Sequence, residues 1–167
     1  YLNDKTGPTM TITAADGAGI GGAVSDGATT NNPSLAVTFT SSESTTNFAV
    51  SDVTVSGGSL SSFSGSGTTY NATFTPSASG ATTIDVSGST FTDAAGNNNS
   101  AASQFNWTYD GTAPTITGVS LASDNSTIAV TFSEAVYDTY SGSGALETGD
   151  FVFSISGGSA TLASATP

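Results

Sequence analysis

Hydrophobic and polar residues alternate along most of this chain with a period of two residues. In the segment 35–40, Leu35, Val37 and Phe39 would share one face of a strand, while small and hydroxyl-bearing residues would share the other. Such a period predicts a β-strand with one buried face. Five more segments show this alternation, and their apolar positions are Met10 and Ile12, Val53 and Val55, Tyr70, Ala72 and Phe74, Ile84 and Val86, and Phe105, Trp107 and Tyr109. A further segment carries Leu60 and Phe63.

The spacing of these segments indicates the fold class. Turn residues separate the segments, as in the pair Gly57-Gly58, and no segment carries a convincing helical period. Seven short strands over about 100 residues predict an all-β, immunoglobulin-like β-sandwich. Trp107 is expected to fill its core, because the neighbouring positions alternate cleanly. The glycine-rich stretch 16–27 is expected to be a flexible inter-strand loop.

The pattern restarts after the seventh segment. The stretch "DKTGPTMT" (4–11) is echoed by "DGTAPTIT" (110–117), and the strand pattern at 34–39 is echoed at 127–132. A strand order that restarts after about 100 residues predicts a tandem array. We therefore expect three parts: the end of a preceding repeat (1–3), a complete repeat (4–109) and a partial second repeat (110–167).

The partial second repeat has two explanations. Its fifth, sixth and seventh strands are missing, so by itself it would expose apolar faces and unpaired strand edges. Either the chain is an excerpt of a longer array, or a neighbouring identical subunit completes the open sandwich and thereby builds a filament. The length of known tandem arrays favours the first explanation.

Composition excludes several classes of function. The chain has 13 acidic residues, one basic residue (Lys5), no His and no Cys, and its net charge is −12. Such a charge repels phosphate, which argues against nucleic-acid binding. No apolar run approaches the roughly 18 residues of a membrane helix, so membrane insertion is not expected. Because His and Cys are absent and the carboxylates fall in turns, we do not expect an enzyme.

At this point the sequence resembles a known family. The stretches "DKTGPTMTI", "VTFTSSESTTNFAVSDVTVSGGSLSSF", "YNATFTP", "FTDAAGN" and "FNWTYDGTAP" together resemble the bacterial immunoglobulin-like tandem repeats of large surface adhesins and biofilm-associated proteins. The resemblance covers 4–110 closely, and 110–167 is similar to a variant repeat with an insertion at 137–150. It implies an extracellular spacer at the bacterial cell surface, in cell adhesion or a biofilm matrix. It also implies that calcium binds between domains, as in many such repeats.

Four polar residues are expected to meet at one pole of the sandwich. Asp4 begins the first strand, Glu43 follows the second, and Asp93 and Asn97 lie between the sixth and the seventh. In a seven-strand sandwich these positions all return to the same end. Carboxylate and amide oxygens with loop carbonyls are ligands that Ca²⁺ prefers, so the cluster predicts a calcium site.

The second repeat reproduces part of this candidate site with Asp110 and Glu134. A cation at such a pole would tie neighbouring repeats together and stiffen the joint between them. Each residue alone also has a structural explanation. An Asp before Thr commonly makes a turn, Gly96 suits a tight loop at positive φ, and Glu43 can simply be solvated.

A third class of function is a carbohydrate-binding accessory module. Tyr137 and Tyr140 lie in the insertion of the second repeat, where they could stack on sugars or pack on the sandwich edge. The expected partners are therefore neighbouring repeats or identical subunits, with cell-surface or matrix glycans as a further candidate.

Overall fold

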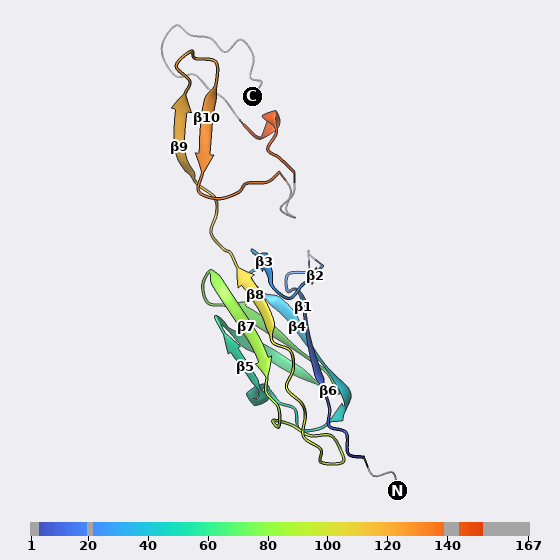
Figure 1. Ribbon diagram of the computed structural model, residues 1–167. Helices are drawn as coiled ribbons and strands as arrows, with labels where there is room; N and C mark the ends of the chain where they lie inside the picture. Colours follow the sequence, from blue (N-terminus) through green and yellow to red (C-terminus); the bar gives the residue numbers. More distant parts are fainter. Residues whose placement is uncertain (1–3, 20–21, 139–143, 152–167) are drawn as a thin grey trace. The chain divides into compact units, whose positions relative to one another are not determined.

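The computed structural model describes residues 4–19, 22–138 and 144–151 (Figure 1). The chain divides into two compact units, Tyr1–Thr112 and Ala113–Pro167, and each is described by itself. Both contain β-strands, and the described part also has two short 3-10 helices, η1 (Val50–Asp52) and η2 (Thr148–Asp150). Neither helix is long and apolar enough to span a membrane.

The first unit is a β-sandwich of two four-stranded sheets. One sheet has the order β2-β1-β4-β6, and its strands are β2 (Ala23–Val24), β1 (Met10–Asp16), β4 (Leu35–Thr45) and β6 (Gly58–Pro76). The other has the order β3-β8-β7-β5, with β3 (Ala28–Thr30), β8 (Phe105–Tyr109), β7 (Gly80–Val86) and β5 (Val53–Ser56). Every segment of the first repeat that was predicted as a strand lies in one of these strands. The prediction of an immunoglobulin-like β-sandwich is confirmed.

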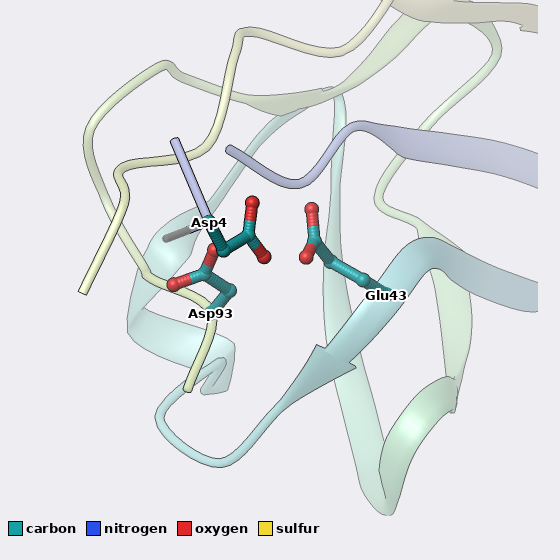
Figure 2. A group of neighbouring side chains, drawn as sticks. All are labelled: Asp4, Glu43 and Asp93. Carbon is teal, nitrogen blue, oxygen red and sulfur yellow. The ribbon is translucent and has the colours of Figure 1, made fainter. Parts of the chain in front are cut away.

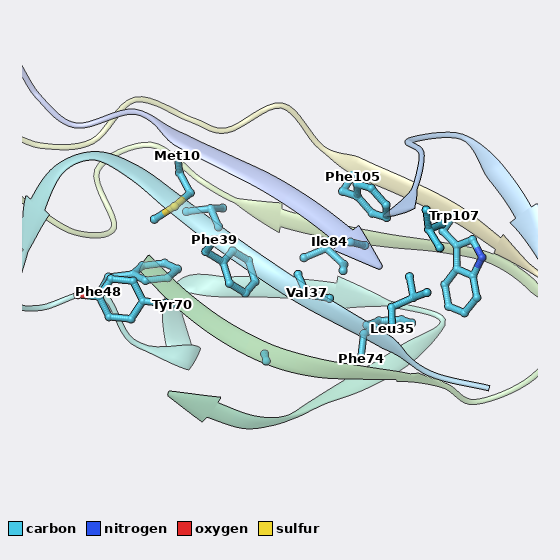
Figure 3. Close-up of a cluster of buried hydrophobic side chains, with 14 of the residues drawn as sticks. Met10, Leu35, Val37, Phe39, Phe48, Tyr70, Phe74, Ile84, Phe105 and Trp107 are labelled. Atoms are coloured by element: carbon cyan, nitrogen blue, oxygen red, sulfur yellow. The ribbon is translucent and has the colours of Figure 1, made fainter. Parts of the chain in front are cut away.

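Strand β4 shows how the alternation produces the core. It pairs antiparallel with β1 on one side and with β6 on the other, which places Phe39 between Ile12 and Tyr70. Leu35, Val37 and Phe39 are at most 1% exposed, because successive residues of a strand point to opposite faces. Figure 3 shows the side chains of the two sheets meeting in one core.

Trp107 belongs to this core, as predicted, and is 2% exposed. Its ring lies edge-on to Phe74, with 5.9 Å between the ring centroids. Its indole N–H donates to Thr30 Oγ1 at 3.0 Å, so the one polar atom of the buried ring has a partner. This bond lies beside the parallel pairing of β3 with β8, and it fixes the short strand β3 on the sandwich.

The fourth and fifth predicted strands form one element, β6, which doubles back on itself. The Ser61 hydroxyl donates to the Thr73 carbonyl at 3.5 Å, so the two arms lie side by side. At the reversal Gly65 has φ +133°, and a Cβ there would lie 2.4 Å from the Thr69 carbonyl oxygen. Only glycine fits this position without strain, and the sequence pattern did not reveal that the two strands are joined in this way.

The glycine-rich stretch 16–27 is more ordered than predicted. It contains strand β2, whose Val24 pairs with Ala14 of β1 and is 7% exposed. Residues 20–21 within this stretch lie outside the described residues. The burial of Val24 and the pairing of β2 with β1 dock this part of the stretch on the edge of the sheet.

The described part of the second unit contains an antiparallel strand pair, β9 (Ile116–Leu121) and β10 (Ile128–Phe132). Val119 faces Val130, and Leu121 faces Ile128. The end of a preceding repeat assigned to 1–3 and the part of the second repeat from residue 152 onward lie outside the described residues, as does Tyr140. Tyr137 is 52% exposed, and its role in sugar stacking stays a prediction.

Candidate metal centre

Three of the predicted ligands come together at one pole of the first unit. One carboxylate oxygen each of Asp4, Glu43 and Asp93 lies within 4.8 Å of the other two. Figure 2 shows the three carboxylates pointing toward one another from separate segments of the chain. Asp4 precedes β1 and Asp93 follows β7, as expected, whereas Glu43 lies within β4, which continues to Thr45. An isolated bridge between Thr45 and Asp93 brings the last two segments together.

Asp93 is the best-anchored member of the cluster. Its Oδ1 accepts hydrogen bonds from the backbone N–H groups of Ala95 and Asn97, both at 2.8 Å. Its Oδ2 accepts a third from Asn97 Nδ2, also at 2.8 Å. The Asn97 side-chain bond, with the backbone bonds of the same loop, lowers the pKa of Asp93, although burial acts against this. The loop closes through Gly96, whose φ is +89°, as the sequence predicted.

Asp4 and Glu43 complete the cluster in different ways. Asp4 makes the expected turn, since its Oδ1 accepts a hydrogen bond from Thr6 N–H at 3.0 Å. The pKa of Glu43 is raised, first by burial and then by repulsion from Asp4 and Asp93. The three carboxylates therefore repel one another, and a bound cation would relieve this repulsion.

The donor set fits a hard cation. Three carboxylates supply oxygen ligands, and Ca²⁺ takes six to eight such ligands, which commonly include backbone carbonyls and water. The hydrogen bonds that lower the pKa of Asp93 favour its ionised form, which is the form that binds a cation. Calcium itself stays a prediction.

The side chain of Asn97, the fourth predicted ligand, acts as a hydrogen-bond donor in this structure. Its Nδ2 donates to Asp93 Oδ2 and to the backbone carbonyls of Asp4 and Thr6, both at 3.3 Å. The structure thus brings Asn97 to the predicted pole, where its amide nitrogen connects two members of the cluster. A direct ligand role for its amide oxygen stays a prediction.

Asp110 and Glu134 belong to different units, so no distance between them is described. Asp110 nevertheless repeats the local turn of Asp4, because its Oδ1 accepts a hydrogen bond from Thr112 N–H at 3.1 Å. Ser133, next to Glu134, makes the same type of hydrogen bond in the second unit that Ser42, next to Glu43, makes in the first. Its Oγ accepts from Thr115 N–H at 2.9 Å, as Ser42 Oγ accepts from Thr9 N–H at 2.9 Å in the first unit.

One important residue of this pole was missed by the sequence analysis. Asn99 is 4% exposed, and its side chain holds the irregular segment between β7 and β8 in place. It is the third residue of an Asn-Asn-Asn run. No periodicity distinguishes it from its two neighbours, so only its burial shows its role.

The first unit is thus an immunoglobulin-like β-sandwich with an acidic pole. The sequence profile of the bacterial Ig-like domain family matches residues 4–109. The chain therefore belongs to this family, as the resemblance implied. Domains of this family are generally non-catalytic structural modules and are typically found on surface proteins. No curated protein and no solved structure gives a match to the chain.

Proposed function

We propose that this chain is a structural spacer of an extracellular bacterial adhesin or matrix protein, and that Ca²⁺ stiffens the joints between its repeats. The observation that carries the proposal is the convergence of Asp4, Glu43 and Asp93 at the pole where the chain enters the sandwich. Family membership supports a structural module. The repeated turns at Asp4 and Asp110 support a recurring joint.

The geometry suits such a spacer. Figure 1 shows that the chain enters the first unit at one pole and leaves it, after β8, at the opposite pole. Each such sandwich would therefore add its long dimension to the reach of an array. A cation bound by Asp4, Glu43 and Asp93 would cross-link the leading segment, β4 and the loop after β7. The direction in which the chain enters the sandwich would then be restricted.

Calcium is expected to stabilise the protein against heat. At a free Ca²⁺ concentration of about 100 times Kd, one site contributes about 2.7 kcal/mol, which corresponds to a rise in Tm on the order of 10 °C. The measurement is a thermal melt of chelator-treated protein, followed by the fluorescence of Trp107, at increasing Ca²⁺. An unchanged Tm up to millimolar Ca²⁺ would count against the cation site.

The variant Glu43→Gln separates two effects of the Glu43 charge: repulsion from the neighbouring carboxylates and attraction of a cation. In chelator we expect Glu43→Gln to raise Tm slightly, because it removes the repulsion that raises the pKa of Glu43. With Ca²⁺ we expect a smaller gain in Tm than in the wild type, because one anionic ligand is lost. Glu147→Gln, an exposed carboxylate of the second unit, is the matched control and should keep the full gain.

A second candidate is a filament subunit that assembles by strand complementation. One observation favours it: apolar side chains of β9 and β10 are exposed, with Ile116 at 60%, Val119 at 65% and Leu121 at 59%. The residue that corresponds to Ile116 in the first repeat, Met10, is 4% exposed. An uncovered apolar strand pair is unusual in a monomer.

Sedimentation velocity tests this second candidate. A filament subunit should sediment as concentration-dependent oligomers, and Val119→Ser should reduce them by removing an apolar side chain from the proposed contact. The exposed Thr40→Ser, in the first unit, is the control and should leave assembly unchanged. A single monomer species of the wild type at all concentrations would contradict strand complementation.

A further inference from the structure

The segment of residues 4–9 runs across the acidic pole between two other parts of the first unit. On one side it pairs with Ser42: Thr9 N–H donates to Ser42 Oγ, and Ser42 N–H donates to the Thr9 carbonyl, both at 2.9 Å. On the other side Ser100 N–H donates to the Pro8 carbonyl at 3.0 Å. The segment is therefore held from both sides before β1 begins.

Packing holds the same segment tightly. Pro8 is among the fully buried side chains of the protein. At the preceding position, a Cβ on Gly7 would lie 1.9 Å from the carbonyl oxygen of Asn98, so no side chain fits there. Gly7 and Pro8 thus bring the backbone into direct contact with the loop that carries Asp93.

Asn97 connects this segment to the loop. Its backbone N–H is fixed by Asp93 Oδ1 at 2.8 Å, and its Nδ2 is fixed by Asp93 Oδ2. The same Nδ2 donates to the backbone carbonyls of Asp4 and Thr6, which belong to the segment of residues 4–9. The bonds to Asp4 and Thr6 join residues that are more than ninety positions apart in the sequence, and they are direct bonds between protein atoms.

We propose that residues 4–9 form a latch that Asn97 closes without any cation. A pull on the leading end of the chain then acts on the sandwich itself, through Asn97, Ser42 and the buried Pro8. In this respect the inference rests on the spacer function proposed above. Within that function, Ca²⁺ would stiffen the joint, while the latch would keep the chain attached.

The chain carries its own reporter of the latch. Lys5 is its only basic residue, so a lysine-specific endoprotease can cut only the bond between Lys5 and Thr6. A protease binds several residues on either side of the bond in extended form, so residues 6–9 must first leave the pole. The rate of cleavage therefore reports the population of the open latch when opening is fast relative to cleavage.

The experiment is proteolysis of the full chain in chelator, with the cut followed by mass spectrometry. We expect slow cleavage of the wild type and about tenfold faster cleavage of Asn97→Ala, because the amide donor is lost. Asn97→Asp keeps the shape but loses the donor, so it should also be cut faster. Asn98→Ala changes an exposed neighbour outside these bonds and should match the wild type.

Two readouts separate the latch from other effects. The Tm of each variant, measured by Trp107 fluorescence, gives the temperature range in which its sandwich stays folded. We expect the faster cleavage of the variants within that range. Equal cleavage of the wild type and Asn97→Ala, or wild-type cleavage as fast as that of the urea-unfolded chain, would overturn the latch. A lack of further protection when Ca²⁺ is added would contradict the cation site and leave the latch standing.

Discussion

Replacing Asn99 by alanine is expected to destabilise the first unit by about 2–4 kcal/mol, because it removes four hydrogen bonds to backbone groups, and the group on Phe91 is buried. The Asn99 amide oxygen accepts from the N–H groups of Thr90 and Phe91, at 2.9 and 3.1 Å. Its amide nitrogen donates to the carbonyls of Ser87 and Ser100, at 2.8 and 2.9 Å. One side chain thus bonds to the backbone of four residues in the irregular segment between β7 and β8.

Urea unfolding followed by the fluorescence of Trp107 measures this loss. Asn98→Ala is the matched control, since it makes the same substitution one position earlier at an exposed residue. It should change the free energy of unfolding by no more than about 0.5 kcal/mol. A loss below about 1 kcal/mol in Asn99→Ala would show that water or a relaxed loop satisfies the freed groups. Because the same loop carries Asp93, we also expect the variant to weaken any Ca²⁺ response.

The second large effect is expected for Phe39→Ala, at about 3–5 kcal/mol. Phe39 is 0% exposed, and its ring meets Phe48 at a centroid distance of 5.6 Å and Phe63 at 6.3 Å. Both contacts reach beyond its own strand, so the surrounding rings would have to move to fill the cavity. The residual cavity adds to the lost transfer free energy of the phenyl ring.

Urea unfolding with the Trp107 signal also measures this second effect. Thr40→Ala, the next residue on the opposite and exposed face of β4, is the control and should cost about 0.5 kcal/mol or less. Equal stabilities of Phe39→Ala and Thr40→Ala would contradict the assignment of the two faces of β4. The two variants therefore test the alternation from which the fold was predicted.

The strands were predictable because burial of one face imposes a period of two on the sequence. Val37 and Phe39 lie where the pattern placed them, on the core face of β4. The union of two predicted strands in β6 was not predictable, because pairing between the two arms depends on contacts such as that of Ser61 with Thr73. Strand β2 was missed because a two-residue strand is too short to show a period.

The pole at which the candidate ligands meet was predictable from the sequence, whereas the hydrogen bonds among them were not. Strand order in a sandwich determines which loops share a pole, and the structure brings Asp4, Glu43 and Asp93 within 4.8 Å. The contacts of Asn97 were not predictable, since an amide can offer either an oxygen or two N–H groups. Which of them it offers depends on the carbonyls and carboxylates around it.

The sequence by itself determined the fold class, the positions of the main strands and the acidic character of the surface, because hydrophobic period and net charge are properties of the chain. The tertiary structure alone decided that Asn99 is buried while Asn98 is exposed, and that Asn97 joins Asp93 to the leading segment. Three adjacent asparagines are chemically identical. Their roles differ because burial and hydrogen-bond partners are set by residues that are distant in sequence and near in space.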